Sequence, residues 1–179
     1  MTYDQAFDGL PVNCPTHIKE RQRLITVKYY SFDNKIHQGQ LVIDVDLVED
    51  IEFAFEEALK EEFPINSVIP ISYESFRRNG RWDDDLSMEA NNSSAFNYRT
   101  ITGGQVLSMH ARGRAIDINP MQNPYIRGRI TLPANSVYNP EIEGTLTDDN
   151  VIVRTLVSRG WSWGGNWTAL KDYQHLEKE

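Results

Sequence analysis

Cysteine is almost absent from this chain, because Cys14 is the only one among 179 residues. A single thiol cannot form an intrachain disulfide, and it excludes a metal site built from several cysteines. Long apolar runs are missing as well, so no stretch reaches the ~20 residues of a membrane-spanning helix. The opening segment, MTYDQAFDGLPVNCPTH, has no basic stretch followed by an apolar one. It therefore does not predict a secretory leader, although a leader removed earlier would leave the same sequence.

Positive charge is also scarce, since 18 Lys and Arg face 26 Asp and Glu and the net charge is −8. Phosphate binding needs a basic face, so this balance argues against a nucleic-acid partner. Hydrophobic residues make up 40% of the chain, which is typical of a globular protein and not of a disordered one. The length suits one domain with a core of its own. We expect a monomer.

The first half of the chain predicts a strand pair followed by a helix. Residues 24–30 are β-branched and aromatic, and residues 40–47 alternate between apolar and polar. Asp33-Asn34 between them marks a turn, which makes the pair a hairpin. Residues 49–62 carry apolar side chains at helical spacing and end before Pro64. Residues 68–73 suggest a third strand.

The second half alternates loops with short regular segments. We predict a loop-rich insertion at 77–88, a turn at Gly103-Gly104, a strand at 114–118, a long loop at 119–144, a helix at 149–158 and a last strand around 172–175. The three acids Asp83–Asp85 in the insertion could bind a cation such as calcium, or they could form a solvated loop.

Adjacent strand pairs with few helices favour the α+β class, as a single domain with a central antiparallel sheet. Residues 1–22 are polar and contain Pro11 and Pro15, so we predict an irregular N-terminal arm packed on a domain of residues 23–179.

The segment SMHARGRAID, residues 108–117, carries the first candidate metal ligands. Gly113 can adopt a positive φ, which lets the chain turn between His110 and a strand that bears Asp117. On that strand Ala115 and Asp117 share one face, while Ile116 points to the opposite face. Asp117 is therefore expected to face the same cleft as His110.

The segment Asp172-Tyr-Gln-His175 supplies a second carboxylate and a second imidazole. Zinc accepts neutral imidazole nitrogen and carboxylate oxygen, and a catalytic site keeps one position open. An isolated His and Asp pair would more often be a surface histidine and a turn acid. Because two of only four histidines fall in these two motifs, we predict Zn²⁺ bound by His110, Asp117 and His175, with Asp172 as a base.

SMHARGRAID resembles the Ser-x-His-x-x-Gly-x-Ala-x-Asp signature of the VanY-type zinc D-alanyl-D-alanine carboxypeptidases and L-alanyl-D-glutamate peptidases, and DYQH resembles their closing acid-x-x-His. The resemblance extends from about His37 to Leu176. It implies the Hedgehog/D,D-peptidase fold, the same zinc ligands with Asp172 as general base, and a peptidoglycan stem peptide as substrate. Such a substrate implies a location in the bacterial envelope or outside the cell.

Three further residues are candidates for the site. Among Arg81, Arg99, Arg112 and Arg114, we predict that Arg99 stabilises the oxyanion, because it ends the family-like segment FNYR and precedes the zinc loop. An ordinary ion pair is the alternative for Arg99. We expect Ser108 to orient the substrate or the zinc loop, since it has no histidine partner for a nucleophile role. We expect Trp163 to wall a substrate groove, although tryptophans at this spacing often lie in a core.

Two functions remain compatible with these residues. In the first, a zinc peptidase cleaves stem peptides, with zinc-activated water as the nucleophile and Asp172 carrying the proton to the leaving amine. The second is a catalytically silent zinc module that binds wall fragments or a protein partner. A silent module has no reason to keep an acid at position 172, so Asp172 favours the enzyme. By resemblance, an aspartate base is typical of endopeptidase-like members, which favours L-Ala-D-Glu cleavage.

Overall fold

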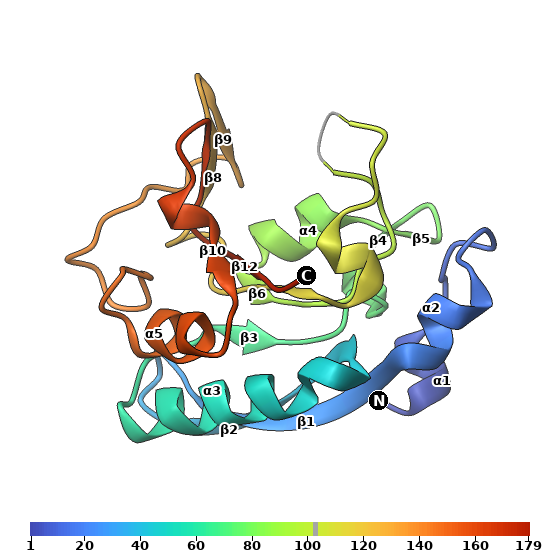
Figure 1. Cartoon of the computed structure of the whole chain (residues 1–179), viewed down its shortest axis with the longest axis horizontal. Helices are drawn as coiled ribbons and strands as arrows, with labels where there is room; N and C mark the ends of the chain where they lie inside the picture. Colours follow the sequence, from blue (N-terminus) through green and yellow to red (C-terminus); the bar gives the residue numbers. More distant parts are fainter. Residues whose placement is uncertain (102–103) are drawn as a thin grey trace.

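The computed structural model describes residues 1–101 and 104–179, so Gly103 of the predicted turn lies outside the described residues. A long hairpin forms one side of the molecule (Figure 1), with strands β1 (Gln22–Tyr30) and β2 (Ile36–Asp44) paired in antiparallel register. Helix α3 (Val48–Lys60) packs against this hairpin. The hairpin and the helix are confirmed, since their apolar residues Leu41, Ile43 and Ile51 are fully buried in one core.

Strand β2 starts and ends earlier than the predicted range of 40–47. The Asp44 side chain accepts a hydrogen bond from the Asp46 backbone N–H and begins a 3-10 turn at Val45–Leu47, designated η1. Because an aspartate at such a position satisfies a free backbone donor, it ends the strand there. Val45 consequently points outward and is 38% exposed.

Several small sheets replace the predicted central antiparallel sheet. Most strands contain only two or three residues, because the segments between them are rich in Pro, Asn and Gly. The mixed helix and strand content agrees with the predicted α+β class. One antiparallel sheet contains, in this order, β10 (Ser162–Trp163), β12 (His175–Glu177) and β7 (Ala115–Asp117). A second antiparallel sheet contains β11 (Lys171–Asp172), β8 (Tyr125–Arg127) and β9 (Ile130–Leu132). A parallel pair is formed by β3 (Ser67–Val68) and β6 (Asn92–Ser93).

The N-terminal arm is more regular than predicted, since it contains helices α1 (Tyr3–Ala6) and α2 (Thr16–Arg21). Ala6, Phe7 and Ile18 are buried and form a second apolar cluster with Val42 and Phe96. The arm is therefore packed on the rest of the chain, and this contact stabilises its short helices.

The insertion at 77–88 was predicted as a loop, but it forms strands β4 (Arg77–Arg78) and β5 (Arg81–Trp82) and helix α4 (Asp84–Glu89). Asp83 caps α4, because its carboxylate accepts from the Leu86 backbone N–H at 3.1 Å. Asp83 also pairs with Arg78, and Asp84 pairs with Arg99. These contacts give Asp83 and Asp84 structural partners, and the candidate metal cluster among the described residues lies elsewhere, at His110, Asp117 and His175.

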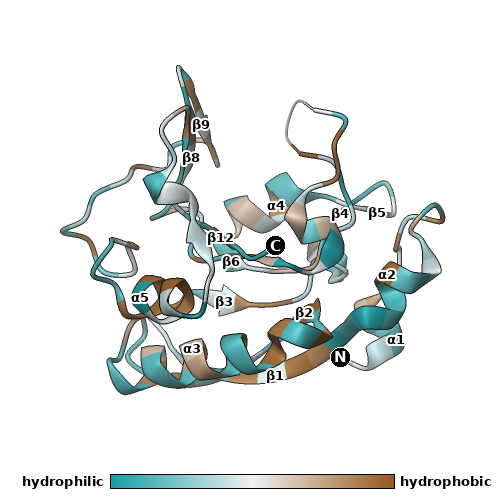
Figure 2. Ribbon diagram, viewed as in Figure 1, coloured by the Kyte–Doolittle hydropathy of each residue, from teal (hydrophilic) through white to brown (hydrophobic). Residues whose placement is uncertain are grey.

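Helix α5 (Val151–Ser158) begins at the Asn150 cap and not at Thr147 or Asp148. It packs on α3, and Figure 2 shows hydrophobic residues on both α5 and the strands of the hairpin. Ile116, Ile118 and Leu176 join this core from the other side, so the core supports strands β7 and β12 from behind. None of the helices in the described ranges combines the length and the apolar character required to span a bilayer.

Candidate metal centre

A single helical turn positions His110. The 3-10 turn η3 (Met109–Arg112) starts at Ser108, whose hydroxyl accepts from the His110 backbone N–H at 3.2 Å. It ends at Gly113, which adopts the left-handed conformation with φ of 68°. A Cβ atom there would collide with the Gln22 side chain and lie 2.9 Å from the Asp44 backbone nitrogen. The glycine is therefore required both for the turn and for its close approach to the hairpin.

Asp117 and His175 face each other across the β7–β12 pair, in which they are register partners. Partners in an antiparallel pair project to the same face of the sheet. Their neighbours Ile116 and Leu176 point to the opposite face and are fully buried in the core. The apolar alternation of these strands thus turns both candidate ligands, Asp117 and His175, toward His110.

Three acceptor atoms converge where these elements meet. His110 Nε2 lies 3.0 Å from His175 Nδ1 and 3.2 Å from Asp117 Oδ2, and His175 Nδ1 lies 3.0 Å from Asp117 Oδ1. One ligand atom from each residue falls within 4.8 Å of the other two. All three residues are more than nine-tenths buried, so the cluster is shielded from bulk water.

In each histidine, the contact of the ring nitrogen that faces away from Asp117 identifies the tautomer. His110 Nδ1 lies 2.6 Å from the Ala95 carbonyl, which can only accept, so Nδ1 carries the proton. His175 Nε2 lies 2.9 Å from a Glu177 carboxylate oxygen and must donate in the same way. The two nitrogens that face Asp117 are then lone-pair acceptors in the neutral rings. Three facing acceptors repel one another unless a cation or a proton lies between them, so the donor set fits a metal ion.

The close contacts among these residues also shift the pKa values of Asp117 and His175. Burial would raise the pKa of Asp117, but the two histidines outweigh it and hold that pKa far below its usual range. Burial would lower the pKa of His175, but its hydrogen bonds to Asp117 and Glu177 raise it to about 10. Without a metal, a proton on His175 therefore compensates the buried carboxylate.

Asp172 lines the same cavity but is not one of the three convergent ligands. Its Oδ1 is inaccessible and has no hydrogen-bond partner among the described residues. Burial raises the pKa of Asp172 to about 7, and the Asp117 charge adds to this effect while His175 opposes it. A carboxyl group with a pKa near neutrality can both accept and return a proton.

Residues 102–178 match a family described as D-alanyl-D-alanine carboxypeptidase. This match agrees with the family that the sequence motifs predict. The matched segment holds His110, Asp117, Asp172 and His175, whereas the earlier part of the resemblance, from about His37, lies outside it. The searches of curated proteins and of solved structures found no match. The carboxypeptidase match supports a peptidase, and the His-Asp-His cluster supports a metal site in it.

The candidate carboxypeptidase centre opens into a cavity of about 410 Å³. Among the four arginines considered from the sequence, Arg99 alone lines this cavity. Its Nη2 lies 2.7 Å from Asp84 Oδ2, so the ion pair that was its alternative role is present at the cavity wall. Ser108 also lines the cavity and supports the His110 turn.

The tryptophan positions differ from the prediction for a substrate groove. Trp163 is buried in the core and donates its indole N–H to the Tyr173 carbonyl at 2.8 Å. Trp167 lines the cavity instead, with its ring centroid 5.4 Å from that of His175. Both residues belong to the segment WSWGGNW, in which the turn η4 (Gly164–Asn166) redirects the chain. Spacing alone could not distinguish the two residues.

Glu177 and Arg127 are cavity residues that the sequence motifs did not indicate. Glu177 follows His175 by two residues on strand β12, so it shares a face with its histidine partner. This period-two relation could have identified Glu177 once the strand had been predicted. Arg127 comes from hairpin β8–β9, which the sequence predicted as loop.

Proposed function

We propose that this protein is a zinc-dependent peptidase that hydrolyses peptide bonds in peptidoglycan stem peptides. The observation that carries the proposal is the convergence of His110, Asp117 and His175 beside a cavity that Asp172 lines, with an Asp172 Oδ1 atom that is inaccessible and has no hydrogen-bond partner among the described residues. Two imidazoles and one carboxylate are the ligand set of catalytic zinc sites. Zinc bound there would act as a Lewis acid on the scissile carbonyl and lower the pKa of water.

Asp172 is the general base in this proposal. It accepts a proton from the attacking water and delivers it to the amine that leaves the cleaved bond. Burial keeps the carboxylate from being satisfied by solvent, so its basicity is available to the substrate. The unpartnered Oδ1 supports this role, because a buried carboxylate oxygen in a purely structural position is normally hydrogen-bonded.

Arg99 stabilises the negative charge that develops on the carbonyl oxygen. A guanidinium offers five donors, of which the ion pair with Asp84 uses only part. Nη2 contacts Asp84 and Nη1 donates to the Thr100 carbonyl at 3.2 Å, so each of these two nitrogens keeps one N–H for a substrate oxygen. Ser108 keeps the His110 turn in place, and Trp167 replaces Trp163 as the aromatic wall beside the ligands.

The family and the base each favour a different bond in the stem peptide. The matched family is described by D-alanyl-D-alanine carboxypeptidase activity, and the aspartate base favours L-Ala-D-Glu endopeptidase activity by resemblance. The substrate belongs to the cell wall, so we propose that the protein acts as a monomer in the bacterial envelope or outside the cell.

Digestion of purified peptidoglycan, with and without a chelator, tests the proposal. Mass analysis of the released ends identifies the bond, because a free D-alanine and a new D-glutamate amine differ in mass and position. We expect chelator-sensitive release of one of these products and about one zinc per chain by metal analysis. A protein that binds zinc and wall fragments but releases no product would instead be a catalytically silent module.

A further inference from the structure

A second cavity of about 520 Å³ adjoins the proposed active site. It shares two lining residues, Asp84 and Arg99, with the cavity at the metal ligands. These two residues form the 2.7 Å ion pair described above, and Asn97 holds the other Asp84 oxygen at 2.9 Å. The Asp84–Arg99 ion pair therefore lines both cavities.

The N-terminal arm builds the outer wall of this second cavity through residues 9–13. The wall is attached on both sides. The Asp8 carbonyl accepts from Trp82 Nε1 at 2.8 Å, and the Asn13 carbonyl accepts from the Tyr98 hydroxyl at 3.3 Å. Gly9 has a φ of 79°, and a Cβ atom there would lie 3.1 Å from Trp82 Nε1. The arm thus follows a defined path over the cavity and is not a loose end.

The lining combines aromatic rings with one uncompensated positive charge. Trp82 and Tyr98 supply apolar surface with polar tips. Arg99 is neutralised by Asp84, whereas Arg81 is exposed and forms no ion pair within residues 1–101 and 104–179. In a chain with a net charge of −8, this guanidinium is a local site for an anion. A carboxylate is the natural partner, because the planar fork of arginine matches its geometry.

We propose that this second cavity is a substrate subsite, which receives the part of the stem peptide beyond the reacting bond and places one of its carboxylates beside Arg81. The inference rests on the proposed function, because the ligand is the same peptide that enters the metal site. It assigns substrate selection to the arm and to strand β5, which lie outside the family-matched segment.

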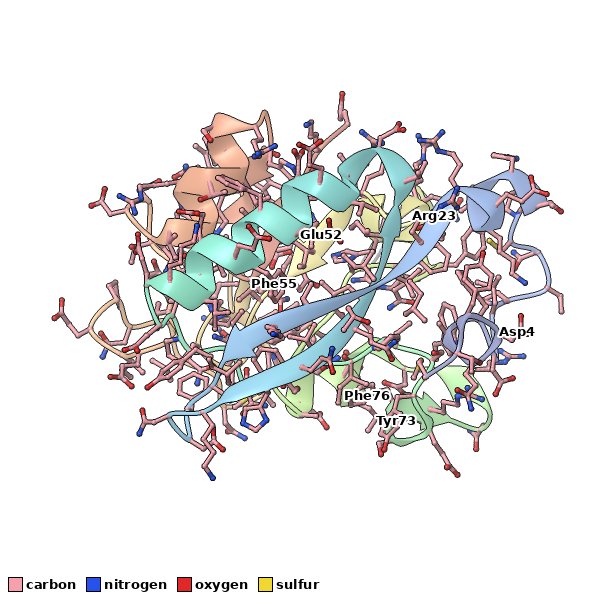
Figure 3. The ribbon with its side chains drawn as sticks, turned by 90° about the horizontal axis from the view of Figure 1, so that it is seen from below. Asp4, Arg23, Glu52, Phe55, Tyr73 and Phe76 are labelled. Atoms are coloured by element: carbon pink, nitrogen blue, oxygen red, sulfur yellow. The ribbon has the colours of Figure 1, made fainter. Side chains whose placement is uncertain are left out.

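Two synthetic substrates test the subsite. The short one contains only the scissile dipeptide with blocked ends, and the long one extends it by flanking residues that carry a free carboxylate. We expect the wild type to show a KM about tenfold lower for the long substrate, the worth of one charge-assisted contact. Arg81→Glu should reduce this ratio to about one, while Arg81→Lys should retain part of it. Arg23→Ala is the matched control, since Arg23 lies on β1 in the view from below (Figure 3) and does not line either cavity.

An unchanged KM ratio in Arg81→Glu would overturn the subsite. If the wild type cleaves neither substrate, the proposed function fails, and the subsite is then judged by binding alone. Calorimetric titration of the long peptide into the wild type and Arg81→Glu gives that answer. About tenfold tighter binding by the wild type supports the subsite even without turnover, and equal binding excludes it.

Discussion

At the scale of single residues, His175 stands between two carboxylates that have different tasks. Asp117 approaches its Nδ1 at 3.0 Å, and Glu177 approaches its Nε2 at 2.9 Å. The first contact lies within the candidate ligand set, whereas the second fixes the ring orientation and the tautomer. The hydrogen bond from His175 also lowers the pKa of Glu177, so Glu177 remains an acceptor at neutral pH.

Asp172→Asn separates the base from the ligands. The substitution keeps the size of the side chain and removes its proton acceptor. We expect zinc content and melting temperature to be retained, while turnover falls by about two to four orders of magnitude. His175→Ala should instead lose both metal and activity. Zinc analysis, thermal melting and peptidoglycan digestion of both variants measure this, and an active Asp172→Asn enzyme would remove the proposed base.

Glu177→Gln should weaken metal binding without abolishing it. The amide can still accept from His175 Nε2, but its charge no longer increases the basicity of the ring. Loss of such a supporting partner typically costs about 10- to 100-fold in metal affinity. Competition with a chromophoric chelator measures the affinity. Glu179→Gln is the control, because Glu179 also lines this cavity. A similar loss of metal affinity in that variant would mean that the negative charge near the site matters, and not the contact with His175.

Arg99→Ala should lower turnover about a hundredfold or more, the usual worth of one oxyanion-stabilising group. Zinc should remain bound, because Arg99 is not among the three ligands. Steady-state kinetics together with zinc analysis provide the measurement. Arg112→Ala is a matched control, since that exposed arginine lies outside the cavity. Wild-type rates in Arg99→Ala would mean that another group, such as Arg127, serves the oxyanion.

The three residues of the candidate metal cluster could be predicted to lie together, because metal-binding chemistry restricts them to a few residue types in two short motifs. Trp167 could not be distinguished from Trp163, since the turn between them depends on packing that spacing does not encode. Asp84 was obscured by its position in a run of three acids, which differ only in their partners: Asp83 caps a helix and Asp84 holds Arg99. The roles of these residues therefore depend on long-range contacts, which the sequence motifs do not specify.

At the scale of elements, the turn that carries His110 is held against the hairpin. The Asp44 backbone N–H donates to the Gly113 carbonyl at 2.9 Å, and Gln22 Nε2 donates to the Arg112 carbonyl at 3.0 Å. Gln22 and Asp44 lie outside the family-matched segment, and they therefore support the candidate ligand His110 from another part of the chain. The hairpin was predictable from its alternation, but this contact was not, because it joins residues far apart in sequence.

Gly113→Ala should destabilise the protein and weaken zinc binding. The added methyl group meets both a positive φ and the crowded hairpin backbone, so we expect a loss of at least about 2 kcal/mol. Gly128→Ala is the matched control, because Gly128 also has a positive φ, at 62°, but has open space around it. Its cost should be limited to about 1 kcal/mol of backbone strain. Chemical denaturation measures both, and equal losses would show that the approach to the hairpin is unimportant.

At the scale of the whole molecule, Asp50 joins three segments of the chain. Its carboxylate accepts from Lys178 Nζ at 2.8 Å, Trp161 Nε1 at 2.9 Å and Arg159 Nη1 at 3.0 Å. Burial alone would raise the pKa of Asp50, but these donors outweigh it and the pKa lies below its usual range. Helix α3 is thereby connected to the end of α5 and to the residue after β12.

The lowered pKa of Asp50 determines how its contribution to stability depends on pH. Because the folded-state pKa of Asp50 is depressed, its contribution is present above the unfolded value of about 3.9 and is lost as the pH falls through the folded value. Asp50→Asn should cost about 2 kcal/mol at pH 7 and much less at pH 2. Urea denaturation at both pH values measures the difference. Glu49→Gln, at an exposed neighbouring position, should change stability little at either pH.

Chelation should lower the melting temperature of the whole protein. If zinc is present at about a thousand times its dissociation constant, it stabilises the folded state by about 4 kcal/mol. For a chain of this size, that corresponds to a shift of about 10 °C. Calorimetric melting with and without chelator measures it. His110→Ala should melt at the lower temperature and be insensitive to the chelator, and a wild type without any shift would contradict a metal-linked fold.

His110 and His175 are separated by 65 positions in the chain, and this separation makes the proposed ion a cross-link. A bridge across a loop of that length restricts the unfolded ensemble by about 4 kcal/mol in chain-entropy terms. With one cysteine, the chain has no covalent means of closing the same loop. The ion would therefore serve as a reversible counterpart of a disulfide, one that acid or a chelator opens and free zinc closes again.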